Sequence, residues 1–143
     1  MFIGEYQHTI DEKGRLAIPV KFRAELRKGA VVTKGLDSCL FVYSLAEWKK
    51  LAAKVASLPF SQADNRAFSR QILGGAMDAE LDAQGRVILP EYLRRFAGLA
   101  KDTVITGLYD RLEIWDKAAW TKYQTETEKN SNEIAERLGG ISV

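Results

Sequence analysis

The chain has 143 residues, of which 46% are hydrophobic and 28% are charged, and its formal net charge is +2. These values are typical of a soluble globular protein, and the charge gives only a weak indication of nucleic-acid binding. The single cysteine, Cys39, excludes an intramolecular disulfide framework and fits a reducing compartment. No stretch approaches the roughly 20 apolar residues of a membrane helix, and no signal peptide is apparent, so we expect a cytoplasmic protein without a membrane partner.

The first part of the chain is predicted to contain two strands and a short helix around a tight turn. Residues 5–10 and 15–18 have the composition of strands, and the turn lies between them. Residues 19–28 are predicted to form a helix, because Phe22 and Leu26 are four positions apart on one face. The expected order is therefore strand, turn, strand and helix.

Two further strands and a second helix follow. The strands are expected over residues 30–33 and 40–43, on either side of a turn. Ser44 and Glu47 have the spacing of a capping box, which predicts the start of a helix. The apolar stripe of this helix consists of Trp48, Leu51, Ala52 and Val55.

The same pattern then returns in the second half of the chain, after a predicted linking helix over residues 61–73. Residues 11–19 match residues 82–90, and each copy contains Asp, Gly, Arg, three apolar residues and Pro. Thirteen identities relate the halves, at a shift of 71 residues that becomes 72 beyond residue 28: Gly4/Gly75, Asp11/Asp82, Gly14/Gly85, Arg15/Arg86, Pro19/Pro90, Arg23/Arg94, Val32/Val104, Gly35/Gly107, Leu36/Leu108, Leu40/Leu112, Ala46/Ala118, Trp48/Trp120 and Lys50/Lys122. The chain therefore consists of two tandem copies of one unit.

The second copy is expected to close with a helix begun by Asp116. Nothing between residues 118 and 138 breaks the helical pattern, so one long helix is predicted, with fraying beyond Gly140. The predicted organisation is a first repeat over 5–47, a helical linker over 48–75, a second repeat over 76–119, and a C-terminal helix and tail over 120–143. The fold class is α+β. Each copy has only about 45 residues and a marginal core, so we expect the copies to pack on each other, on another chain, or on both.

Arg15 and Arg86 are the main candidates for a binding function. Each follows a tight turn, where a displayed guanidinium can bond a guanine edge in the major groove or clamp a phosphate. The alternative is structural, because Asp11 and Asp82 can pair with these arginines at a solvated turn. The residues alone leave the two interpretations even.

Basic residues surround the first of these turns. They are Lys13, Lys21, Arg23, Arg27 and Lys28, whereas the second copy has fewer. Such a stripe attracts a phosphate backbone and makes binding strongly dependent on salt. We assign Asp11 and Asp82 to capping the turns and orienting the arginines, and Gly14 and Gly85 to supplying a positive φ. The Trp48/Trp120 pair is predicted to belong to the core rather than to a base-stacking platform.

The residues that catalysis needs are scarce. His8 is the only histidine and has no counterpart in the second copy, and Cys39 is likewise unrepeated. One His and one Cys do not make a zinc site without further ligands, and Gly-rich phosphate loops are absent from the sequence. We therefore expect no enzymatic activity, no cofactor, no metal and no small-molecule substrate.

The doubled Asp-x-x-x-Arg motif, each copy leading into an apolar triplet and Pro, closely resembles the MraZ family. Residues 1–6 (MFIGEY) and 81–90 (LDAQGRVILP) strengthen a resemblance that covers nearly the whole chain. The family belongs to the AbrB-like class, whose units dock or swap hairpins. The resemblance thus implies two tandem AbrB-like repeats that form a pseudo-symmetric double-split β-barrel flanked by helices.

The resemblance also implies a function. It predicts a cytoplasmic, nucleoid-associated transcriptional regulator that binds repeats in double-stranded DNA upstream of a promoter. Its target would be the division and cell-wall operon containing its own gene, and it would act as a ring-shaped homo-oligomer. Residue by residue, the family motif falls on Asp11, Arg15, Asp82 and Arg86, with Arg15 as the stronger DNA contact.

Other functions stay open on the sequence alone. One is an oligomeric protein-interaction module of the antitoxin type, in which the C-terminal helix captures a partner. A second is a hydrolase or transferase whose site is shared between subunits, and a third keeps nucleic acid but makes it RNA. The residues also do not show whether each hairpin pairs within its own chain or with a neighbour's.

Overall fold

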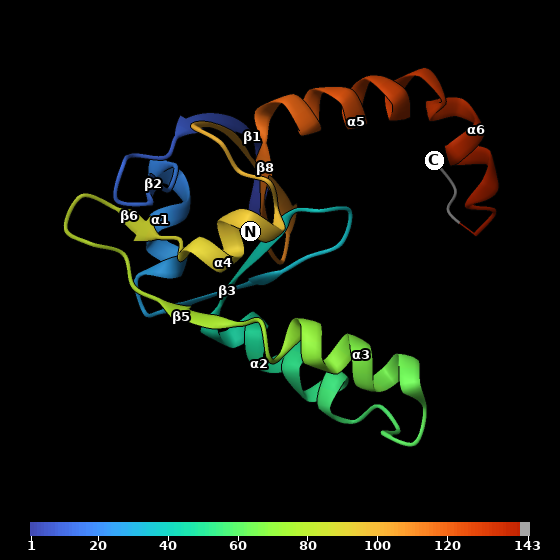
Figure 1. Ribbon diagram of the computed structural model, residues 1–143. Helices are drawn as coiled ribbons and strands as arrows, with labels where there is room; N and C mark the ends of the chain where they lie inside the picture. The colour runs from blue at the N-terminus through green and yellow to red at the C-terminus, as the bar shows by residue number, and fades with distance from the viewer. Residues whose placement is uncertain (141–143) are drawn as a thin grey trace.

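The structure is a computed structural model that describes residues 1–140. Eight strands and six helices in this part of the chain form one six-stranded antiparallel sheet, one two-stranded sheet and the helices around them (Figure 1). In chain order the elements are β1 (Phe2–Thr9), β2 (Arg15–Ala17), α1 (Val20–Leu26), β3 (Ala30–Lys34), β4 (Leu40–Ser44), α2 (Leu45–Ala56), α3 (Ala63–Ile72), β5 (Met77–Ala79), β6 (Arg86–Ile88), α4 (Glu91–Phe96), β7 (Asp102–Tyr109), β8 (Leu112–Asp116), α5 (Lys117–Lys129) and α6 (Ser131–Arg137).

The two repeats exchange strands with each other. The order of the large sheet is β1-β7-β8-β4-β3-β5. The first strand of each repeat, β1 or β5, therefore pairs with the third strand of the other repeat, β7 or β3. β1 pairs with β7 over its whole length, from Phe2 opposite Tyr109 to Thr9 opposite Asp102. β5 pairs with β3, β4 with β8, and β2 with β6. Pairing within one chain therefore completes both repeats.

The predicted turn in each repeat is present, but its two flanking strands do not form a long hairpin. In the first repeat, a single bridge between Ile10 and Leu16 joins the two arms. β2 leaves the turn and pairs with β6 instead. Both strands are short and curve away from the large sheet, and they stand together at one end of the molecule (Figure 1).

The main core lies between the large sheet, the small sheet and helices α1 and α4, and both repeats contribute to it. Phe22 of α1 is fully buried, and its ring makes edge contacts with Phe2 at 5.3 Å and Tyr6 at 5.4 Å between centroids. Aromatic pairs in this geometry stabilise a core beyond the area that they bury. The prediction that Phe22 and Leu26 share a buried face is confirmed.

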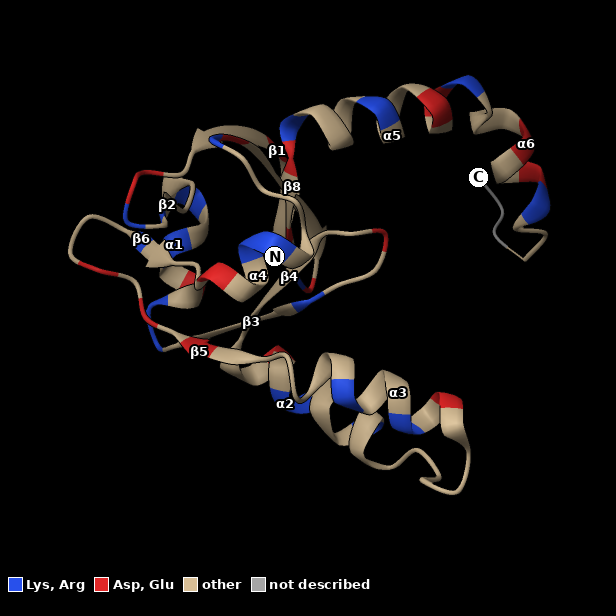
Figure 2. Cartoon of the chain, in the orientation of Figure 1, with Lys and Arg blue, Asp and Glu red and all other residues tan. Residues whose placement is uncertain are grey.

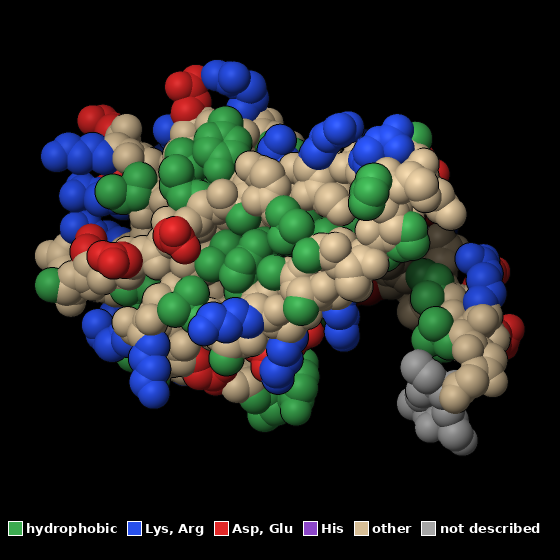
Figure 3. Space-filling model, turned by 90° about the horizontal axis from the view of Figure 1, so that it is seen from below, with side chains coloured by type: hydrophobic (Ala, Val, Ile, Leu, Met, Phe, Trp, Pro, Cys, Tyr) green, Lys and Arg blue, Asp and Glu red, His purple; other side chains and the backbone are tan. Residues whose placement is uncertain are grey.

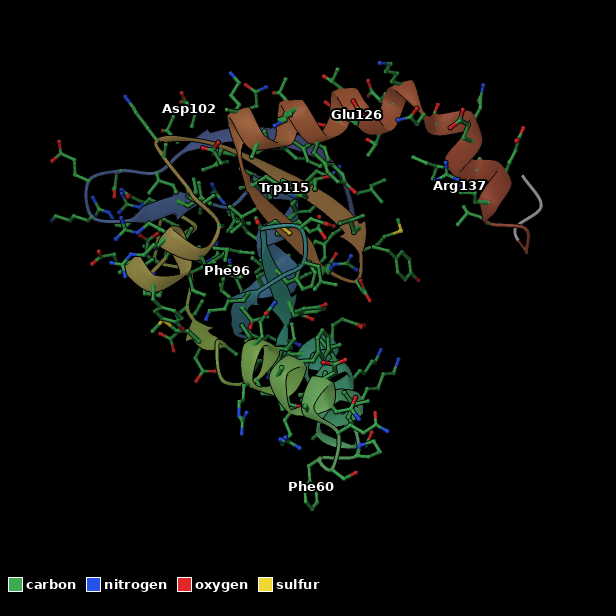
Figure 4. The ribbon with its side chains drawn as sticks, turned by 45° about the vertical axis from the view of Figure 1, so that its right-hand side comes forward. Phe60, Phe96, Asp102, Trp115, Glu126 and Arg137 are labelled. Carbon is green, nitrogen blue, oxygen red and sulfur yellow. The ribbon has the colours of Figure 1, made fainter. Side chains whose placement is uncertain are left out.

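A second cluster covers the other face of the large sheet. Successive residues of a strand point to opposite faces, so Leu40 and Val42 enter the main core while Phe41 and Tyr43 enter the second cluster. Trp115 lies in this cluster near the centre of the molecule (Figure 4), and Trp48 and Trp120 pack against it. The tryptophan pair is partly buried and packs against this cluster, in agreement with the prediction that it belongs to the core.

Two helical arms project from this body. α2 and α3 form one arm, with exposed Phe60 at its tip, and α5 and α6 form the other, with Arg137 near its end (Figure 4). The predicted cap of α2 is present, since Ser44 Oγ accepts a hydrogen bond from the Glu47 N–H at 3.3 Å. The predicted linking helix corresponds to α3.

The prediction of one long C-terminal helix is wrong, because the helix breaks at Asn130. Asn130 adopts φ −106° and ψ 16° and separates α5 from α6. Its side-chain amide donates to the Glu126 carbonyl oxygen at 3.1 Å. Asn competes for backbone hydrogen bonds in this way and favours helix ends. The expected fraying of residues 141–143 lies outside the described residues.

Two further expectations concern the whole fold. The described strands make an open six-stranded sheet and a separate two-stranded sheet, so closure into a double-split barrel stays a prediction. Among residues 1–140, no helix combines the length and the apolar content needed to cross a membrane.

Phe22→Ala tests the main core. We expect it to lower the free energy of unfolding by about 3 to 5 kcal/mol, because it leaves a cavity between β1 and α1. Val20→Ala on the same helix is the control, since Val20 is 75% exposed and its truncation removes little buried area. Urea unfolding followed by circular dichroism measures both changes, and similar small losses for the two variants would contradict the placement of Phe22.

Candidate nucleic-acid interface

The two turns have the same hydrogen-bond geometry. Asp11 Oδ1 accepts hydrogen bonds from the backbone N–H groups of Lys13 and Arg15, at 2.9 Å each, and Asp11 Oδ2 accepts one from Arg15 Nε at 2.6 Å. In the second turn Asp82 Oδ1 accepts from the Arg86 N–H at 2.9 Å, and Asp82 Oδ2 accepts from Arg86 Nε at 2.8 Å. One carboxylate thus closes each turn and holds the guanidinium that follows it.

These contacts keep both carboxylates ionised. The backbone N–H of Arg15 is the largest cause that lowers the pKa of Asp11, and that of Arg86 does the same for the pKa of Asp82. A carboxylate that accepts several N–H groups is stabilised in its charged form. Each turn therefore presents a fixed Asp–Arg pair near neutral pH.

The arginines remain accessible despite these pairs. The side chains of Arg15 and Arg86 are 30% and 29% exposed. Within residues 1–140, the hydrogen bonds of both guanidinium groups to protein involve Nε, and their terminal nitrogens have no such partner. Those nitrogens are the ones that bond a guanine edge or a phosphate bidentately. The structural and the binding interpretations of the Asp–Arg pair are thus compatible.

The pairing of β2 with β6 brings the two arginines onto one face. Leu16 and Val87 lie directly opposite each other and are 0% exposed, so they form the inner face of the small sheet. Arg15 and Arg86 each neighbour one of these residues along the strand and therefore lie on the outer face. The sequence predicted two separate turns with one arginine each, and the register of β2 and β6 makes them one surface. Figure 2 shows basic residues along the ribbon around β2, β6 and α1.

The turn glycines are needed for more than their positive φ. Gly14 and Gly85 have φ values of +79° and +78°. Arg23 of the first repeat donates from Nε to the Ile18 carbonyl oxygen at 2.8 Å and lies directly against Gly85 of the second turn. Arg94 makes the corresponding contact with Gly14. Each turn is thus backed by an arginine of the other repeat.

This role of Arg23 and Arg94 is not apparent from the sequence. The only indication in the sequence is that arginine occupies the same position, 23 or 94, in both repeats. Its basic character alone places Arg23 with the other basic residues around the first turn. Arg23 is half-buried, in contrast to the exposed Lys21 of the same helix.

The remaining predicted basic residues are exposed, and they are spread over the first repeat. Lys13 lies in the first turn with Arg15. Lys21 lies on α1, with its Nζ 5.5 Å from the centroid of the Tyr6 ring. Arg27 and Lys28 follow the C-terminal end of α1. Figure 3 shows basic side chains gathered at the left end of the molecule, with acidic groups close beside them.

The surroundings of the two arginines differ in charge. A groove of about 480 Å³ beside Arg86 is lined by Asp78, Glu80 and Asp82. The first turn contains Lys13, which Glu12 balances, and the positions equivalent to Asp78 and Glu80 hold the uncharged Gln7 and Thr9. Arg15 therefore lies in the more favourable setting for a polyanion, because acidic groups repel a phosphate backbone.

His8 and Cys39 lie apart from this surface. Burial, followed by the nearby Arg23, lowers the pKa of His8, so its ring is neutral at pH 7. Burial raises the pKa of the Cys39 thiol to about 12, which makes it unreactive near neutral pH. No group of three or more His, Cys, Asp or Glu residues in the described part of the chain is arranged to hold a metal ion.

The fold and the site define a duplicated α+β protein in which two Asp-anchored arginines share one exposed face. The family model described as "MraZ protein, putative antitoxin-like" matches residues 1–71 and again 72–140. The chain belongs to the MraZ family.

Several similar proteins have the same name, Transcriptional regulator MraZ. The protein from Thermoanaerobacter sp. (strain X514) is 49% identical over 143 residues, and the one from Acetivibrio thermocellus is 48% identical over 143 residues, with 100% of each chain covered in both cases. The protein from Moorella thermoacetica is 50% identical over 138 residues, which cover 96% of each chain.

Gly14→Ala tests the packing of the first turn. A Cβ on Gly14 would lie 2.9 Å from the Leu89 carbonyl oxygen, which is backbone and held by its neighbours. Gly98→Ala is the control, because Gly98 also has a positive φ, +59°, but has nothing within 4 Å of the new Cβ. We expect Gly98→Ala to lower the free energy of unfolding by about 1 kcal/mol and Gly14→Ala by at least about 1 kcal/mol more. Equal losses in thermal or urea unfolding would contradict this close packing.

Proposed function

We propose that this protein is a sequence-specific DNA-binding transcriptional regulator without catalytic activity. The observation that carries the proposal is the pair of arginines, each fixed by an aspartate, on one exposed face of β2 and β6. Preorganised guanidinium groups lose little freedom on binding and match both guanine edges and phosphates. The name of the relatives, Transcriptional regulator MraZ, supports the same conclusion.

The proposed mechanism divides the basic residues by task. Arg15 bonds a guanine edge in the major groove, and Arg86 makes a weaker contact because acidic groups surround it. Lys13, Lys21, Arg27 and Lys28 contact phosphates, which fixes the protein on the duplex without reading its sequence. Arg23 packs directly against Gly85 and donates to the Ile18 carbonyl oxygen, so we assign its main role to supporting the second turn.

We further propose a ring-shaped homo-oligomer whose two-repeat subunits close as double-split β-barrels. The α5–α6 arm supports assembly, because neither helix has a buried residue while Ile134 and Leu138 near its end are exposed. Apolar side chains gathered on a projecting arm favour a protein partner. Repeated subunits would also raise the avidity of a weak individual DNA contact.

The biological setting is proposed from the resemblance of the sequence motifs, and the relatives' names support only the role in transcription. The protein would act in the cytoplasm, associated with the nucleoid, on the division and cell-wall operon that contains its own gene. Its DNA target would be a set of repeats upstream of the promoter. A second candidate, a protein-interaction module of the antitoxin type, is favoured by the words "putative antitoxin-like" in the family description.

Arg15→Ala is the direct test of DNA recognition. In gel-shift titrations with DNA from upstream of the gene, we expect the parent to bind and Arg15→Ala to lose roughly 5- to 150-fold in affinity, the value of one bidentate base contact. Titrations from about 50 to about 200 mM salt should show a steep loss of parent binding. Light scattering of both proteins confirms that their assembly is unchanged.

Arg70→Ala is the matched control for this experiment. It removes the same charge from an exposed position on α3, away from β2 and β6 (Figure 1). We expect it to bind like the parent. Equal binding by Arg15→Ala and the parent would contradict the mechanism, and no binding by any of the proteins would favour the protein-partner candidate.

Ile134→Glu tests the proposed assembly. A buried charge at a contact between subunits is costly, so we expect the mass measured by light scattering to fall toward that of the monomer. Asn132→Glu introduces the same charge at a nearby exposed polar position on α6, and we expect its oligomer to have the same mass as that of the parent. An unchanged mass for Ile134→Glu would show that this arm does not hold the oligomer together.

A further inference from the structure

The outer face of the small sheet contains an exposed apolar residue directly opposite Arg15. In the register of β2 and β6, Arg15 faces Ile88. Ile88 is 63% exposed, although the neighbouring Val87 is 0% exposed. Single exposed hydrophobic residues are common, so the exposure alone has no meaning. The position of Ile88 is informative, because residues directly opposite in an antiparallel pair have their Cβ atoms roughly 4.5–5.5 Å apart on the same face.

The two halves of this face differ at the corresponding position. At the shift of 71 residues, Ile88 corresponds to Ala17, and Ala17 is the residue that faces Arg86. The backbone and the arginines repeat, but the side chain beside each arginine does not. Directly across the strand pair, Arg15 therefore has a long, branched apolar side chain and Arg86 has a single methyl group. Ile88 also lies two residues along the strand from Arg86 and lines the groove beside it, so it is next to both arginines.

We propose that Ile88 is a specificity-determining residue that contacts the C5 methyl of a thymine close to the guanine bonded by Arg15. The inference rests on the proposed function, since it requires Arg15 to lie in the major groove. The thymine methyl is displayed only in that groove, and apolar side chains recognise it by contact. The spacing of the two Cβ atoms is comparable to the roughly 3.4 Å rise between bases in one strand, so the two side chains reach the same or adjacent base pairs.

Replacing thymine by deoxyuridine removes only the methyl group and tests the inference directly. The upstream fragment is prepared with dTTP and, separately, with dUTP, and the affinity of each is measured for the parent and for Ile88→Ala. We expect the parent to bind the uridine fragment more weakly, by roughly fourfold for each methyl contacted. We expect Ile88→Ala to bind the two fragments equally, because it no longer has the contacting group.

Ile3→Ala is the matched control, since Ile3 is also an exposed strand isoleucine, 52% exposed, at the end of β1 far from the turn. It should keep the preference of the parent for thymine. The inference is wrong if Ile88→Ala keeps that preference, because the preference would then arise from the shape or stiffness of the DNA. It is also wrong if the parent binds both fragments equally.

The outcomes separate this inference from the proposed function. If the parent binds the thymine fragment and Arg15→Ala does not, the proposed function stands whatever the result for deoxyuridine. If the parent binds neither fragment, the proposed function and the inference about Ile88 fail together. Because Ile88 is mostly exposed, its truncation leaves the folded protein intact, and thermal unfolding of the variant verifies this.

Discussion

The pairing of β2 with β6 is the interaction on which the rest of the structure depends. It joins the two repeats at the point where each has just left its turn, and it buries Leu16 and Val87 beneath one outer face. Backbone hydrogen bonds extend this contact, from the Ile18 N–H to Gly85 and from the Leu89 N–H to Gly14. Neither turn is therefore held by its own repeat alone. A repeat of this size has a marginal core by itself, and exchange between the two copies solves that problem.

The same exchange supports the turns that hold the arginines. Asp11 fixes the Nε of Arg15 from within the turn, while Arg94 supports Gly14 from the other repeat. Arg23 supports the second turn in the same way. Two arginines therefore serve the fold, and two others are displayed, although all four are equally basic in the sequence. The division follows from the partners of the arginines, since all four are half-buried and bonded through Nε. Arg23 and Arg94 donate to backbone carbonyl oxygens and pack against a turn glycine of the other repeat, whereas Arg15 and Arg86 are held by aspartates on the outer face of the small sheet.

Local features of this site could be predicted from the sequence, and contacts between the repeats could not. The spacing of Asp11, Gly14 and Arg15 specifies a tight turn, because each residue type acts on its own backbone. The partner of β2 depends on which strand the other repeat offers, and hydrophobic periodicity contains no information about it. The break at Asn130 was missed for the opposite reason. It depends on one side-chain amide, whose effect a pattern over about 20 residues averages out.

Duplication gives this protein a symmetric backbone with an asymmetric surface. Equivalent positions beside the arginines hold Ile88 and Ala17, and the groove beside Arg86 is acidic while Lys13 accompanies Arg15. A symmetric face would bind a DNA site equally well in two orientations. Under the proposed function, unequal halves would make one orientation better than the other, because Arg15 with Ile88 opposite and Arg86 with Ala17 opposite would meet different base pairs.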